Sequence, residues 1–192
     1  REGLPALALS ELIRHRLEHE SLVEKVAEST LPTTLAGEVR AIVYHSKMTN
    51  VEHVALVKGN VAGDAPVLVR VQAEHTVADV FGGTTPSSRA NLQNSLKEIG
   101  ERGAGVVLYL RRPFTDHKGS TVQHVSESPP SKAATMMRDY GVGAQILRDL
   151  GITQVELLTS TPRALEGLSS FGITVVGQSP IPQLLALTGH TV

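Results

Sequence analysis

Short apolar runs bounded by turn residues recur along the chain and predict a series of β-strands. The first three runs are rich in β-branched residues, and we interpret them as antiparallel strands. Two later runs are fully or mostly apolar, as expected for strands that are buried on both faces. The predicted strands cover residues 38–44, 52–57, 67–71, 106–110, 155–158 and 173–176.

Apolar positions that recur every three or four residues predict helices. Residues 10–27 follow this period, with Ser10 as a candidate N-cap and Pro32 at the end of the segment. Residues 88–102 place Leu92, Leu96 and Ile99 on one helical face. Further helices are predicted over residues 132–138 and 144–150, with a break at 140–143 and Gly151 as C-cap, and over residues 162–168.

Together these elements predict an α/β or α+β arrangement. Residues 82–88 and residues 112–132 are rich in Gly, Pro, Ser and Thr and are interpreted as loops, the second of them mobile. The chain has 192 residues, 41% of them hydrophobic, which is enough to bury a sizeable core.

Charge and composition exclude several classes of function. The net charge of −1 and the 3% aromatic content argue against a nucleic-acid partner, which needs basic patches and stacking side chains. The chain has no cysteine, so it forms no disulfide. Its apolar runs are shorter than the roughly 20 residues that span a bilayer, so we expect no membrane partner and a cytoplasmic location.

Four sequence blocks stand out along the chain: VEHVALVKG at 51–59, VRVQAEHTVADVF at 69–81, GVVLYLR at 105–111 and RDYGVGAQILRDLG at 138–151. These blocks resemble the GTP cyclohydrolase II family, whose zinc enzymes open the imidazole ring of guanine at the start of riboflavin synthesis. The resemblance covers residues 35–180 and implies the family's mixed sheet flanked by helices, together with a homodimer.

The residues that would hold zinc in this family are replaced. The family uses three cysteines, and their positions here carry His75, Pro86 and Ser88. A zinc site needs three or four thiolate, imidazole or carboxylate donors, so we predict no zinc cofactor. The family's proposed proton acceptor, an aspartate two residues before Arg138, is replaced by Met136, which carries no proton.

Some residues of the family's site are retained. Arg70 and Glu74 match the strand that holds GTP phosphates, Arg138 stands at the position of the proposed nucleophile, and Thr159 remains from a late motif. Arg70 and Arg138 therefore predict weak binding of GTP or another phosphate ligand. A structural role is equally compatible with the sequence and is the interpretation we favour, since arginine also pairs with carboxylates.

The histidines suggest two further metal sites. In both cases we favour the simpler interpretation that the histidines are ordinary solvated side chains. His15 and His19 lie four residues apart on a predicted helix, a spacing that can clamp zinc. His117 and His124 lie in the predicted mobile loop and could rebuild an imidazole site together with His75.

The first third of the chain resembles the junction of bifunctional riboflavin proteins, in which a dihydroxybutanone phosphate synthase domain precedes the cyclohydrolase. We therefore divide the chain into a helical linker arm over residues 1–34 and a GTP cyclohydrolase II-like domain over residues 35–192, and expect a fused or associated synthase domain. We predict that this domain lacks zinc-dependent GTP ring-opening activity and serves a structural, regulatory or nucleotide-binding role. The alternative is an active enzyme with zinc-independent chemistry on a nucleotide or sugar phosphate.

Overall fold

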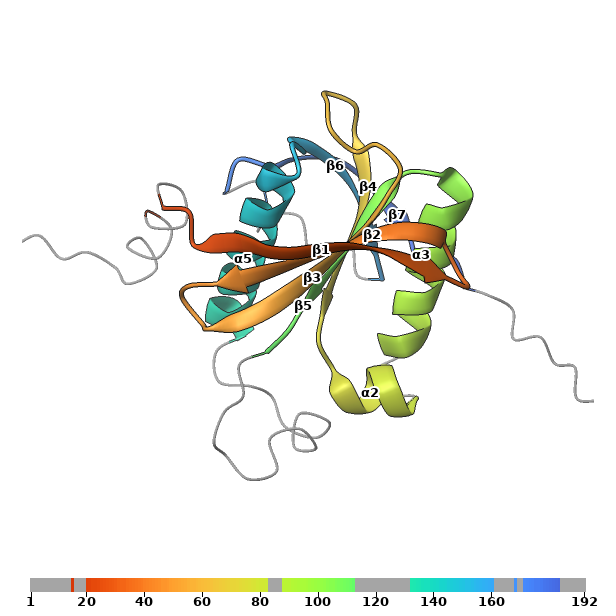
Figure 1. Ribbon diagram of the computed structural model, residues 1–192, viewed down its shortest axis with the longest axis horizontal. Coiled ribbons are helices and arrows are strands. Elements are labelled where there is room, and N and C mark those ends of the chain that lie inside the picture. The colour runs from red at the N-terminus through yellow and green to blue at the C-terminus, as the bar shows by residue number, and fades with distance from the viewer. Residues whose placement is uncertain are drawn as a thin grey trace, which may run out of the picture.

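A mixed β-sheet with helices on both faces forms the centre of the molecule (Figure 1). The computed structural model describes residues 15, 20–82, 88–112, 132–160, 168 and 171–183, with the backbone alone for 132–138. Within these residues the strands are β1 (Val23–Thr33), β2 (Gly37–Ser46), β3 (Val51–Lys58), β4 (Val67–Ala73), β5 (Gly105–Leu110), β6 (Gln154–Thr159) and β7 (Thr174–Pro180). The helices are α2 (Thr76–Phe81), α3 (Ser88–Arg102) and α5 (Lys132–Asp149).

The sheet has an antiparallel half and a parallel half. Its strand order is β1-β2-β3-β5-β4-β6-β7, and β1, β2, β3 and β5 pair antiparallel. β4 is parallel to both of its neighbours, β5 and β6, so the prediction that the first three runs are all antiparallel is wrong for β4. The reason is that β5 lies between β3 and β4, and the connection through α2 and α3 returns the chain in the same direction.

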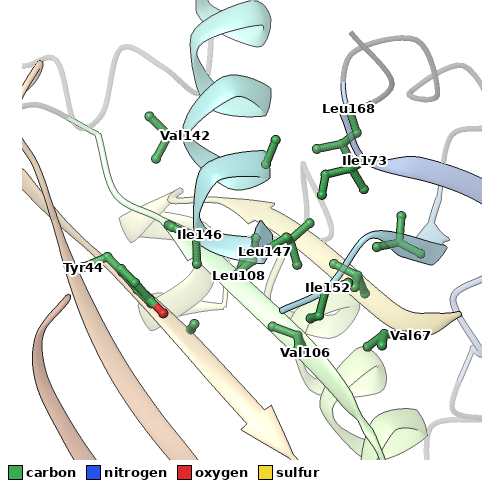
Figure 2. Close-up of a cluster of buried hydrophobic side chains, with 14 of the residues drawn as sticks. Tyr44, Val67, Val106, Leu108, Val142, Ile146, Leu147, Ile152, Leu168 and Ile173 are labelled. Atoms are coloured by element: carbon green, nitrogen blue, oxygen red, sulfur yellow. The ribbon is translucent and has the colours of Figure 1, made fainter. Parts of the chain in front are cut away.

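The helices α3 and α5 cover opposite faces of the sheet (Figure 1). The larger apolar cluster packs α5 against the central strands, and Figure 2 shows Ile146 and Leu147 of α5 beside Leu108 of β5. The smaller cluster packs Ile99 of α3 against the other face. The α/β class and the flanking helices predicted from sequence are therefore confirmed, and in the described residues the helices are too short or too polar to cross a membrane.

The helix predicted over residues 10–27 is wrong from Val23 onward, where the chain forms β1. This strand pairs with β2 from Val23 opposite Ser46 to Thr33 opposite Gly37. Because β1 is an edge strand with nearly all its side chains exposed, it lacks the apolar alternation by which a half-buried strand is detected. Pro32 does not end the element, since proline is tolerated on an edge strand.

The predicted break at residues 140–143 is also wrong, because α5 runs without interruption through Gly141 and Gly143. At Gly143 a Cβ would lie 3.7 Å from Cδ1 of Leu108, which is an ordinary van der Waals distance, so the helix packs against β5 at this position. Packing against the sheet thus outweighs the low helix propensity of glycine. The C-cap prediction is confirmed: Gly151 has φ +76°, and its N–H donates to the carbonyl of Arg148 at 3.0 Å.

Candidate functional site at the carboxyl ends of β4 and β5

Arg70 lies on β4 and uses its guanidinium group inside the protein. Its Nε and Nη2 donate to Oε1 of Gln72 at 3.1 and 2.6 Å, and its Nη1 donates to the carbonyl of Leu158 on β6 at 3.2 Å. Arg70 forms no ion pair with a carboxylate of the described residues. Both acceptors of Arg70 are therefore neutral. The structural interpretation expected a carboxylate partner, and the structure shows a side-chain amide and a backbone carbonyl instead.

A chain of hydrogen bonds leads from Arg70 to a carboxylate. The buried Gln72 accepts from Arg70 and donates through Nε2 to Oγ of Ser88 at 2.5 Å. Ser88, the first residue of α3, donates in turn to Oδ1 of Asp79 at 2.5 Å. Every bond donates in the same direction, so the cation at one end is linked to the anion at the other through two neutral side chains.

Asp79 on α2 is the acceptor on which this network converges. Its Oδ2 accepts from the hydroxyl of Tyr109 on β5 at 2.7 Å and from the backbone N–H of His75 at 2.8 Å. With Ser88 bound to Oδ1, one carboxylate ties together the start of α3, the end of β5 and the turn after β4. We name the group formed by Arg70, Gln72, Asp79, Ser88 and Tyr109 the polar network.

Burial sets the protonation of this network. The pKa of Arg70 is lowered by burial, yet the guanidinium stays charged at neutral pH because arginine is not deprotonated in proteins. The pKa of the Tyr109 phenol is raised, first by burial and then by its hydrogen bond to Asp79, so the phenol remains a donor. Arg70 and Tyr109 therefore remain hydrogen-bond donors at neutral pH.

His75 caps α2 with its ring. Its Nδ1 accepts from the backbone N–H of Ala78 at 3.4 Å, so in the neutral ring the proton is on Nε2. A histidine that binds a metal through Nε2 needs the opposite arrangement, with Nδ1 carrying a hydrogen that it donates to a carbonyl or carboxylate.

Glu74, beside His75, joins the ends of β4 and β5. Its backbone N–H donates to the carbonyl of Leu110 at 2.8 Å, and its Oε2 accepts from the backbone N–H of Arg112 at 3.0 Å. Its Oε1 accepts from the hydroxyl of Thr76 at 3.4 Å. The carboxylate that the resemblance assigned to a ligand contact thus organises the backbone at this edge of the sheet.

His53 is buried on β3 at the same edge. Its Nδ1 accepts from the backbone N–H of Arg111, the residue after β5, at 3.1 Å. Its pKa is lowered to about 4, first by burial and then by the positive charges of Arg111 and His45. The ring is therefore neutral at pH 7, with its proton on Nε2.

The structure places three of the retained site positions, Arg70, Glu74 and Thr159, on β4 and β6 or directly after β4. Thr159 ends β6 one residue after Leu158, whose carbonyl accepts from Arg70, and Glu74 follows β4 directly. Arg138 lies within α5, but its side chain and that of Met136 are outside the described residues. His15 is exposed. Outside the described residues lie Pro86, His19, His117 and His124, the predicted helix at 162–168 except for Leu168, and almost all of the predicted loops.

Sequence reasoning missed Gln72, Asp79, Tyr109 and His53. Three of them are polar or amphipathic residues within otherwise apolar strands, which is the signal that would have found them, because a buried polar side chain requires a partner. Asp79 carried no comparable signal, since the short helix α2 was not predicted.

A family model describes the same stretch of sequence as this sheet. The model for GTP cyclohydrolase II matches residues 24–180, from the second residue of β1 to the last of β7. The chain belongs to the GTP cyclohydrolase II family. The prediction from the four sequence blocks is thereby confirmed for the family and the fold.

Several relatives of this GTP cyclohydrolase II family member are proteins of riboflavin biosynthesis. The RibBA protein of Mycobacterium ulcerans is 38% identical over 94% of this chain and 46% of its own length. A monofunctional chloroplastic protein of Arabidopsis thaliana, RIBA 3, is 36% identical over 93% of this chain and 37% of its own. The chain therefore spans less than half the length of these relatives.

A solved structure with the same fold is that of RibBX from A. baumannii. It is a two-domain 3,4-dihydroxy-2-butanone 4-phosphate synthase, superposes with a TM-score of 0.60 and is 25% identical. The match covers 88% of this chain and 44% of that protein.

Proposed function

We propose that this chain is a GTP cyclohydrolase II-type domain that does not bind zinc or open the guanine ring, and that it supports an attached or associated synthase domain. The observation that carries the proposal is the hydrogen bonding at two of the three positions where the family places cysteine. His75 and Ser88 are both committed to protein partners, as the polar network and the cap of α2 require.

The donor set at these positions does not suit zinc. The Nδ1 of His75 accepts a hydrogen bond, which leaves Nε2 protonated and unable to bind a metal. The Oγ of Ser88 lies between Gln72 and Asp79, and a serine hydroxyl is in any case a poor zinc ligand. Among the described residues, no three His, Cys, Asp or Glu side chains are grouped so that they could hold a metal ion.

The chemistry of ring opening depends on that metal. Zinc lowers the pKa of bound water from 15.7 to about 7, which generates a nucleophile at neutral pH. The position of the family's proton acceptor carries Met136, whose thioether cannot take up a proton. Both the nucleophile and the base would have to come from elsewhere, and we therefore place this domain outside the hydrolytic reaction.

A synthase domain is the partner that the relatives favour. The RibBX structure is named as a two-domain 3,4-dihydroxy-2-butanone 4-phosphate synthase, and this chain matches 44% of it. The RibBA relatives likewise extend to about twice the length of the match. A domain that keeps its folded core but loses its own reaction is suited to stabilising or regulating such a neighbour.

We expect no formate above the blank when the purified chain is incubated with GTP and added zinc. The physical reason is the simultaneous loss of the metal donors and of the proton acceptor. A family member with all three cysteines serves as the positive control in the same buffer. Formate released in step with GTP consumption would refute the proposal.

A further inference from the structure

Buried side-chain nitrogens without a hydrogen-bond partner occur at the carboxyl ends of β4 and β5. In the described part of the chain, four buried side-chain polar atoms have no partner, and three of them are Nε2 of His53, Nε2 of His75 and Nε of Arg112. A buried polar group left unpaired costs free energy comparable to a lost hydrogen bond, so native proteins keep few of them. Their occurrence at one edge of the sheet points to a ligand.

Hydrogen bonds connect the chain segments that carry the three residues. His53 accepts from the backbone of Arg111, and the next residue, Arg112, donates its backbone N–H to Glu74, the neighbour of His75. β4 and β5 are parallel neighbours, so their carboxyl ends meet at this edge. In open α/β sheets, ligands bind at the carboxyl ends of the parallel strands.

All three unpaired atoms are donors. The Nδ1 atoms of both histidines accept backbone hydrogen bonds, so the Nε2 atoms carry the hydrogens, and arginine Nε always carries one. His53 is only 5% exposed, and its ring remains neutral because its pKa is lowered to about 4. A ligand that satisfies these groups must therefore present hydrogen-bond acceptors.

The donors left unpaired at this edge include a cationic side chain. Arg111 and Arg112 contribute two positive charges, and the two carboxylates of this edge, Glu74 and Asp79, already accept hydrogen bonds from protein groups. Arginine beside other N–H donors is the usual protein environment of a phosphate group. Arg70 is separate from this set, because its guanidinium donates to Gln72 and Leu158.

We propose that His53, His75 and Arg112 form a binding site for a phosphate group, either the free ion or the phosphate of a small ester. The inference rests on the proposed function in one respect, because His75 can donate to phosphate only if it holds no zinc. Zinc is therefore measured by elemental analysis on the same sample, so that failure of the proposed function is seen independently of phosphate binding.

The test uses histidine variants that separate the two ring nitrogens. An asparagine can replace the acceptor role of Nδ1 but does not reach the position of Nε2, so His53→Asn and His75→Asn remove the proposed donor while keeping the backbone bond. Arg112→Gln removes the charged donor. Arg40→Gln is the matched control for charge, because Arg40 is exposed on β2 and pairs with Glu28.

Titration calorimetry with inorganic phosphate, and in a second arm with ribose 5-phosphate, should give binding by the unaltered chain at millimolar concentrations. Each of the three site variants should weaken it about tenfold or more, the effect of losing one hydrogen bond to a charged group. Arg40→Gln should change it less than twofold. Tighter binding of the ester than of free phosphate identifies an ester as the ligand, and the reverse identifies the free ion.

Nuclear magnetic resonance of the unaltered chain keeps the test independent of variant folding. The imidazole resonances of His53 and His75 should report a proton on Nε2, and phosphate should shift both signals. Absence of phosphate binding at millimolar concentrations, equal binding by all variants, or shifts that spare both His53 and His75 would each overturn the proposal.

Discussion

Replacing Asp79 with alanine is expected to lower the free energy of unfolding by about 3 kcal/mol, since hydrogen bonds to a charged group contribute about 1.5–3 kcal/mol each and this carboxylate is partly exposed. The change leaves the hydroxyls of Ser88 and Tyr109 and the backbone N–H of His75 without their acceptor. Because these donors come from α3, β5 and the turn after β4, the loss loosens three elements at once.

Urea unfolding at neutral pH measures this change. Asp79→Asn retains one carbonyl oxygen and should cost about half as much, whereas Asp64→Ala, at an exposed position before β4, should stay within about 0.5 kcal/mol of the unaltered chain. A loss below about 1 kcal/mol for Asp79→Ala would show that the polar network contributes little to stability.

His53 should make the fold sensitive to mild acid. Its pKa is about 4 in the folded chain and near 6.5 when unfolded, so between these values the unfolded chain binds more protons. The contribution of the neutral ring is complete above pH 6.5 and is lost as the pH falls toward 4. At about 1.36 kcal/mol per pH unit, the loss reaches about 3 kcal/mol.

The measurement compares chemical unfolding of the unaltered chain and of His53→Asn from pH 7.5 down to pH 4. Carboxylates affect both proteins alike, so the difference between the two free energies of unfolding isolates His53. We expect this difference to move in favour of His53→Asn by about 3 kcal/mol as the pH falls. A difference that does not change with pH would contradict the assignment of a neutral, buried ring.

The strands with a buried face were predictable from sequence. The apolar runs of β2, β3, β5 and β6 place side chains in the core, and burial imposes the pattern by which such strands are detected. The edge strand β1 has almost no buried face, so its sequence lacks the apolar alternation by which such strands are detected. The direction of β4 depends on where β5 inserts, which is a property of the whole sheet.

The candidate site was predictable only where the family resemblance supplied it. Arg70, Glu74 and His75 were found by their motif, but the partners they use were not. The bonds from Arg70 to Leu158 and from Arg111 to His53 join residues 88 and 58 positions apart, and no local pattern encodes them. The unpaired nitrogens emerge only when burial and partners are known for each atom.

The zinc content of the purified chain tests the central claim most directly. Protein produced in zinc-containing medium and freed of loosely bound metal should contain far less than one zinc per chain, because His75 and Ser88 are committed to hydrogen bonds and no cysteine is present. A family member with three cysteines, treated in the same way, provides the reference. About one zinc per chain, retained after dialysis, would contradict the claim that this domain has lost its metal site.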